Sequence, residues 1–130
     1  MVQWTNSKTE FYIIVFIVLV ITLGILFVVP SFLPGPYDTF AKCLTEKKLI
    51  FYGAFWCPHC AAQKELLGNS MKYITYVECS TPDFKKTQVC LDNEIVSYPT
   101  WKLSDRTKIT GVQPLENLSR ISGCQLDEKT

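Results

Sequence analysis

The sequence lacks an excess of charge of either sign. Its 130 residues carry 13 lysines and arginines against 12 aspartates and glutamates, which leaves a net charge of +1. This balance gives no support to binding of nucleic acid or of a strongly acidic substrate, because both favour a basic surface. The chain also lacks internal repeats and low-complexity segments. Its length therefore allows one small domain and one further segment.

Charged residues are absent between Glu10 and Asp38. Residues 11–29 are almost wholly apolar, and a helix of that length, at about 1.5 Å per residue, spans about 28 Å, close to the hydrocarbon thickness of a bilayer. A cleaved signal peptide is the alternative. The apolar run exceeds the usual roughly 7 to 15 residues, however, and no small-residue cleavage site follows it. We therefore expect an uncleaved transmembrane anchor over residues 11–33.

Cysteine is absent before and within this apolar run, and all six cysteines follow it. Disulfides persist in oxidising compartments, so this distribution favours an exported domain. The flanking lysines, Lys8 on one side and Lys42, Lys47 and Lys48 on the other, slightly favour the opposite orientation. Taking cysteine usage as decisive, we expect a cytoplasmic tail over residues 1–10 and the rest on the periplasmic, extracellular or luminal side.

Proline and glycine follow the anchor. They are expected to end the membrane helix from Pro30 onward and to form a short, stiff linker over residues 34–36. A domain over residues 37–130 is expected to follow.

Apolar residues in this domain alternate between helical and strand patterns. The continuous apolar run over residues 49–55 is typical of a strand buried on both faces. The other expected elements are helices over 37–47, 57–67 and 114–123, a helix-compatible segment over 83–93, a strand over 73–78, and a hairpin of 101–103 and 108–112. The first two strands with the helix between them form a βαβ unit, and the hairpin makes the sheet mixed. The predicted fold class is therefore α/β, with element order α-β-α-β-α-β-β-α.

Cys57 and Cys60 join the end of the first predicted strand to the helix that follows. Cys57 would lie at the helix N-terminus, where unpaired N–H groups and the helix dipole favour an anion. Pro58 fits the first helical turn, and a protonated His59 would add positive charge. Cys57 is therefore expected to be the reactive thiolate, and Cys60, one turn later, to point inward as the resolving thiol.

Two other interpretations of this pair stay open. It can be half of a zinc site with Cys79 and Cys90, although those two are further apart in sequence than the usual second pair of ligands. It can also be a structural disulfide, which would be strained at a helix start. A C-x-x-C motif between a strand and a helix favours redox chemistry.

Several separated motifs give the chain a more specific resemblance. They are F-A-K-C-L-T, Y-G-A-F-W-C-P-H-C, Y-V-E-C, Y-P-T-W, G-V-Q-P-L-E-N-L and S-G-C. Together they are similar to the thioredoxin-like domain found fused to, or working beside, bacterial and plant homologues of vitamin K epoxide reductase. The resemblance covers nearly all of residues 37–124 and implies a thioredoxin-like fold. One apolar span stands in place of that family's quinone-reducing four-helix membrane part.

The resemblance implies roles for three residues around the dithiol. Pro99 would be a cis-proline facing it, with Tyr98 before it, so that an extended substrate peptide can pair beside Cys57. Trp56 would flank the dithiol and exclude water. The alternatives are an ordinary trans proline and an ordinary half-buried aromatic residue. Phe51 stands where thioredoxin has a proton-accepting acid, and this departure weakens the case for an efficient reductant.

The remaining four cysteines suggest structural disulfides. A disulfide between Cys79 and Cys90 would close a short loop and contribute about 3 kcal/mol to the stability of the folded domain. Free thiols or an electron-relay pair are the alternatives. A bond between Cys43 and Cys124 is also plausible, because the first and last helices can be neighbours in this fold, but sequence alone does not fix the connectivity.

These observations predict a membrane-tethered thiol-disulfide oxidoreductase that acts as an oxidant on cysteine-containing protein substrates. The resemblance points to a quinone-coupled, epoxide-reductase-like membrane protein as the partner that reoxidises it. We expect no cofactor, no metal ion and no nucleic-acid partner. A reductase or isomerase running the same exchange is the first alternative, and a metal-binding or assembly adaptor with this fold is the second.

Overall fold

The computed structural model describes residues 7–126, with side chains described for residues 8–28 and 33–126. The chain divides into two compact units between Leu33 and Pro34, and each is described by itself. Residues 1–6 of the expected cytoplasmic tail and residues 127–130 of the expected domain lie outside the described residues.

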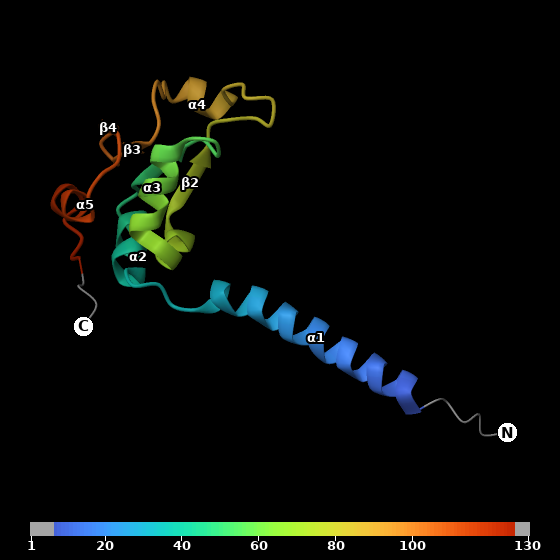
Figure 1. Ribbon diagram of the computed structural model, residues 1–130. Helices are drawn as coiled ribbons and strands as arrows, with labels where there is room; N and C mark the ends of the chain where they lie inside the picture. Colours follow the sequence, from blue (N-terminus) through green and yellow to red (C-terminus); the bar gives the residue numbers. More distant parts are fainter. Residues whose placement is uncertain (1–6, 127–130) are drawn as a thin grey trace. The chain divides into compact units, whose positions relative to one another are not determined.

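The first unit is one long helix, α1 (Ser7–Phe32) (Figure 1). Its segment Lys8–Val28 is long and apolar enough to cross a membrane, by length and composition. The helix continues past Pro30 and ends at Phe32, before Pro34, Gly35 and Pro36. Pro30 removes only one N–H donor near the helix end, whereas Pro34 disfavours helical geometry at the residue before it, and α1 has ended by Leu33.

The second unit contains a four-stranded mixed sheet. The strands are β1 (Ile50–Gly53), β2 (Thr75–Glu78), β3 (Thr100–Lys102) and β4 (Lys108–Thr110). Their spatial order is β2-β1-β3-β4, with β1 and β2 parallel and the other two pairings antiparallel. The predicted α/β class, with a βαβ unit followed by a hairpin, is therefore confirmed.

Helices flank this sheet and follow the predicted order. They are α2 (Asp38–Glu46), α3 (Pro58–Leu67), the short 3-10 helix η1 (Gly68–Tyr73), α4 (Gln88–Asp92) and α5 (Leu115–Ser122). Gly68 ends α3 with a φ of 53° and Gly123 ends α5 with a φ of 71°. Both values lie in the region that glycine adopts most readily.

The segment over residues 83–93, predicted to be compatible with a helix, is helical only in α4. Before it, the Thr81 hydroxyl donates to Asp83 Oδ1 at 2.6 Å and accepts from the Lys85 N–H at 3.0 Å. These side-chain bonds offer the backbone a turn in place of a helix. Ser80 and Lys86 then pair as an isolated bridge, which closes the turn. In Figure 1 this loop and α4 lie beyond the arrowhead of β2.

Two apolar clusters lie on opposite faces of β1, because successive strand residues point to opposite sides. Phe51 belongs to the larger cluster and stacks on Trp101 of β3, with ring centroids 4.9 Å apart. This cluster is completed by residues of α2, α3 and α5. Tyr52 belongs to the smaller cluster, with Cys79, Cys90 and Ile95. The sheet is thus covered on both faces, as the apolar run over residues 49–55 predicts.

Residues 34–36, expected to be a linker, are hydrogen-bonded to the domain. The Gly35 N–H donates to Asp38 Oδ1 at 3.0 Å, and the Tyr37 N–H donates to Ser70 Oγ at 2.8 Å. Ser70 in turn donates to Asp38 Oδ1 at 2.7 Å. A Cβ atom on Gly35 would collide with Ser70, which explains the glycine. The start of the domain is therefore fixed to η1.

Candidate active site

Cys57 and Cys60 lie where β1 passes into α3. The Cys57 N–H donates to the Ala54 carbonyl at 3.0 Å, and the Cys57 carbonyl accepts from the Ala61 N–H at 3.1 Å. Cys57 has extended geometry as the N-cap residue, and Pro58 occupies the first helical turn. Both cysteines are free thiols, with Cys57 6% exposed and Cys60 1% exposed. Cys57 is therefore the outer thiol of the pair and Cys60 the inner one.

The segment before β3 faces the outer thiol. Cys57 Sγ lies 3.8 Å from the Tyr98 carbonyl oxygen, and the Tyr98–Pro99 peptide bond is cis. The Thr100 hydroxyl donates to the Ser97 carbonyl at 2.8 Å, and the Pro99 carbonyl accepts from the Gly111 N–H at 2.8 Å. These bonds hold the backbone in place beside the dithiol.

Exposed aromatic residues precede Cys57 in the sequence and pair with aromatic rings of other segments. Trp56 is 48% exposed, and its indole N–H donates to Ser80 Oγ at 2.8 Å. Its ring meets the Tyr98 ring edge to face, with centroids 6.1 Å apart. Phe55 and Phe84 form a second pair with centroids 5.6 Å apart, and both are more than half exposed. Aromatic surface of this kind is typical of sites that contact apolar groups of a partner.

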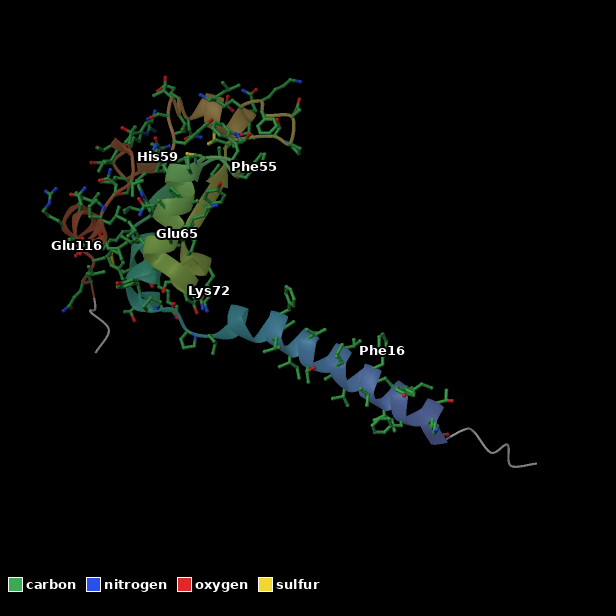
Figure 2. All side chains as sticks on the ribbon, viewed as in Figure 1. Phe16, Phe55, His59, Glu65, Lys72 and Glu116 are labelled. Atoms are coloured by element: carbon green, nitrogen blue, oxygen red, sulfur yellow. A yellow bond between two sulfur atoms is a disulfide. The ribbon has the colours of Figure 1, made fainter. Side chains whose placement is uncertain are left out.

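His59 lies on the exposed surface at the start of α3, at the same end of the domain as Phe55 (Figure 2). Among the described residues, none forms a hydrogen bond or an ion pair with the His59 side chain. Pro58 beside it is also exposed. The expected influence of His59 on Cys57 therefore stays a prediction.

The inner thiol has a markedly different environment. Burial raises the pKa of Cys60 from 9.0 to about 11, and the neighbouring Cys57 adds to this rise. The backbone of Ala54 and the charge of Lys64 act in the opposite direction. Cys60 therefore holds its proton strongly near neutral pH.

A tyrosine of β2, which the sequence analysis did not identify, borders Cys60 across Gly53 and is hydrogen-bonded to a glutamate of the same strand. The Tyr76 hydroxyl donates to Glu78 Oε2 at 2.6 Å, and burial followed by this hydrogen bond raises the pKa of Tyr76. The two residues are two apart in one strand and so share a face. In the parallel register they stand beside Phe51 and Gly53. Only that register, which the sequence does not specify, brings them to the dithiol.

The other four cysteines are joined in two disulfides. Cys43 of α2 is bonded to Cys124 after α5, with Cα atoms 5.9 Å apart. Cys79 is bonded to Cys90, with Cα atoms 5.5 Å apart. Both sulfurs of the second bond are thus unavailable as zinc ligands beside the dithiol. No three or more His, Cys, Asp or Glu side chains within residues 7–126 are grouped to hold a metal ion.

The sheet topology, and a C-x-x-C pair at the start of the helix after its first strand, define a thioredoxin-like domain with a dithiol site. No protein-family model matches the sequence. The chain is similar to the thiol-disulfide oxidoreductase LTO1 of Arabidopsis thaliana, with 38% identity over 100 residues. The match covers 72% of this chain and 26% of the plant protein. The chain therefore corresponds to about a quarter of that relative's length.

Proposed function

We propose that this protein is a thiol-disulfide oxidoreductase that exchanges disulfides with protein thiols through Cys57 and Cys60. One observation carries the proposal: four of the six cysteines are paired, and the two that stay free lie together at the start of α3. Similarity to a plant thiol-disulfide oxidoreductase supports the same chemistry. The exposed aromatic residues that precede Cys57 give a substrate an apolar surface to contact.

The exchange proceeds in two steps. With Cys57 and Cys60 joined, a substrate thiolate attacks Cys57 Sγ, forms a mixed disulfide and displaces Cys60 as a thiolate that takes up a proton. A second substrate thiolate then attacks the substrate sulfur of the mixed disulfide, which releases the substrate disulfide and leaves Cys57 as a thiolate. The two electrons lost by the substrate thiols reside in the reduced dithiol. An extended substrate segment would pair with the backbone beside Tyr98, whose carbonyl oxygen lies 3.8 Å from Cys57 Sγ.

The proposed direction is oxidation of the substrate. Phe51 in place of thioredoxin's acid weakens the case for a reductant. A protonated His59 after Pro58 would stabilise the Cys57 thiolate and so the reduced form, which also favours this direction. Reoxidation would come from a quinone-coupled membrane protein of the epoxide-reductase kind. An α1 anchor would hold both proteins in one membrane and so raise their effective concentration. Two structural disulfides support placing the domain on an oxidising side of that membrane.

A redox titration tests this proposal. The full chain in detergent is equilibrated in glutathione buffers of graded ratio, and free thiols are counted by alkylation and mass spectrometry. One dithiol should titrate, and the transition should vanish in Cys57→Ala. An oxidant should have a reduction potential well above that of thioredoxin, about −270 mV. A lower potential would favour the reductase alternative, and absence of any titrating pair would refute disulfide exchange.

A further inference from the structure

Disulfide exchange through this site requires Cys60 to lose a proton when the dithiol closes and to regain one when it opens. This requirement rests on the proposed function. Cys60 is 1% exposed and holds its proton up to a pKa of about 11. Water therefore has little access to the thiol, and the residue of β1 facing the same cluster, Phe51, cannot accept a proton. Another group must therefore accept the Cys60 proton and return it.

Gly53 marks the place where such a group approaches. A Cβ atom on Gly53 would lie 3.0 Å from Cys60 Sγ, 3.0 Å from Tyr76 Cε2 and 3.4 Å from the Tyr76 hydroxyl oxygen. The thiol and the phenol therefore border one small niche, which exists because residue 53 has no side chain. The Phe51 ring packs against the Tyr76 ring, with ring centroids 5.3 Å apart.

Glu78 completes the arrangement. Its Oε2 accepts a hydrogen bond from the Tyr76 hydroxyl. Its Oε1 accepts hydrogen bonds from the N–H groups of Phe55 at 3.2 Å and Ser80 at 2.9 Å. Three donors thus fix the carboxylate, one of them in the loop that leads to Cys57. The carboxylate is therefore held within hydrogen-bond reach of the Tyr76 hydroxyl, as a proton acceptor for that hydroxyl must be.

Other charged or titratable groups face the same thiol. Lys64 of α3 lies over the Tyr76 ring, with Nζ 4.0 Å from the ring centre, and its charge favours a Cys60 thiolate. Cys57 opposes that ionisation from the helix start. Burial, followed by the charges of Glu78 and Cys60, raises the pKa of Tyr98 in the segment before β3. None of these three groups offers a carboxylate to receive the proton.

We propose that Tyr76 and Glu78 form a proton-accepting pair for Cys60. As Cys60 Sγ attacks Cys57 Sγ in a mixed disulfide, its proton passes to the Tyr76 oxygen while the Tyr76 proton passes to Glu78 Oε2. The Cys57–Cys60 bond forms and the substrate leaves as a thiolate. When a substrate thiolate opens that bond, the same pair returns a proton to the departing Cys60 sulfur.

Stopped-flow mixing of the reduced full chain with excess dithiobis(nitrobenzoate) tests the pair. The first release of thionitrobenzoate reports attack by Cys57 on the reagent, and the second reports attack by Cys60 on the mixed disulfide. The variants are Tyr76→Phe and Glu78→Gln. Glu65→Gln is the matched control, because Glu65 is an exposed glutamate on α3 and lies away from His59 in Figure 2.

In both variants the second release should slow by about tenfold or more at neutral pH. Its rate should then rise about tenfold per pH unit, as expected when hydroxide replaces the lost acceptor. The first release should stay within about twofold, and the control should leave both releases unchanged. Tyr76→Phe keeps the ring contact with Phe51 and leaves both backbone contacts of Glu78 in place. If Glu78→Gln fails to fold, the second release in Tyr76→Phe therefore still tests the proton-accepting pair.

A purely electrostatic role for Glu78 predicts the opposite sign, because removing a negative charge favours the thiolate and speeds the second release. A faster second release in Glu78→Gln would overturn the proposal that Tyr76 and Glu78 accept the Cys60 proton. An unchanged second release and pH profile in Tyr76→Phe would overturn it as well. Absence of both releases in the unaltered chain would instead contradict the proposed function, on which the pair depends.

Discussion

Cys60 couples its own ionisation to folding. Well below the ordinary cysteine pKa of about 8.5, the thiol is protonated in both the folded and the unfolded chain. As the pH rises, the unfolded chain ionises first, whereas burial keeps the folded thiol protonated up to a pKa of about 11. The free energy of unfolding of the reduced chain should therefore fall across this window.

Urea unfolding of the reduced chain and of Cys60→Ala, measured from about pH 8 to about pH 11, checks this sign. The difference in free energy of unfolding between the two should shrink as the pH rises, since only the unaltered chain carries the Cys60 contribution. A constant difference across the window would show that Cys60 ionises alike in both states.

Residue types and spacing were sufficient to single out Cys57 and Cys60, because a C-x-x-C motif between a strand and a helix carries its own structural context. Tyr76 and Glu78 carried no such signal. Their alternation along a strand indicated a shared face, but their approach to Cys60 depends on the pairing of β2 with β1 and on the small size of Gly53.

At the level of elements, Gln63 fastens α3 to the segment before α5. Its side chain is fully buried; Oε1 accepts from the Gln113 N–H at 2.6 Å and from the Trp101 indole N–H at 3.3 Å. Its Nε2 donates to the Gln113 carbonyl at 3.1 Å. Gln63→Leu would leave these buried groups unpaired and should lower the free energy of unfolding by about 2 to 4 kcal/mol.

Chemical denaturation of Gln63→Leu and of a matched control, Gln88→Leu on the exposed face of α4, tests this estimate. The control should change stability by less than about 0.5 kcal/mol. Equal effects of the two variants would mean that the buried amide does not fasten α3 in the way described.

The two disulfides should differ in what their removal affects. The Cys43–Cys124 bond closes a separation of 81 residues and the Cys79–Cys90 bond one of 11. Loop entropy therefore assigns about 4.5 kcal/mol to the first and about 3 kcal/mol to the second. The second bond, however, anchors the loop that carries Ser80 and Phe84 beside Trp56 and Phe55.

Paired serine substitutions at each bond, assayed for both unfolding and thiol exchange, separate these effects. Loss of Cys43–Cys124 should cost more stability, whereas loss of Cys79–Cys90 should slow exchange more. The reverse ranking in exchange rate would show that the loop after β2 does not shape the site.

Element order was predictable because each strand and helix had its own apolar period and boundary residues such as Gly68 and Gly123. The turn over residues 81–87 was not, since the Thr81 hydroxyl competes with helical hydrogen bonds in a segment whose composition suits a helix. α1 continues past Pro30 because one lost N–H donor near a helix end does not stop the helix.

For the whole molecule, the length and apolar composition of α1 predict that the chain is held in a membrane. The full chain should stay with the membrane fraction after alkaline extraction. With the chain in the surface membrane of intact cells, a membrane-impermeant maleimide added outside should label Cys57 in Cys60→Ala. Labelling only after the membrane is permeabilised would place the domain on the cytosolic side.

Capture of substrates is the most direct measurement of the central role given to Cys57. The full chain carrying Cys60→Ala is expressed in cells, thiols are blocked with acid and alkylating agent, and adducts are separated without reductant. Protein adducts that disappear on reduction are predicted, and they should be absent when Cys57→Ala is added. If the single and double variants gave the same adducts, disulfide exchange at Cys57 would be contradicted.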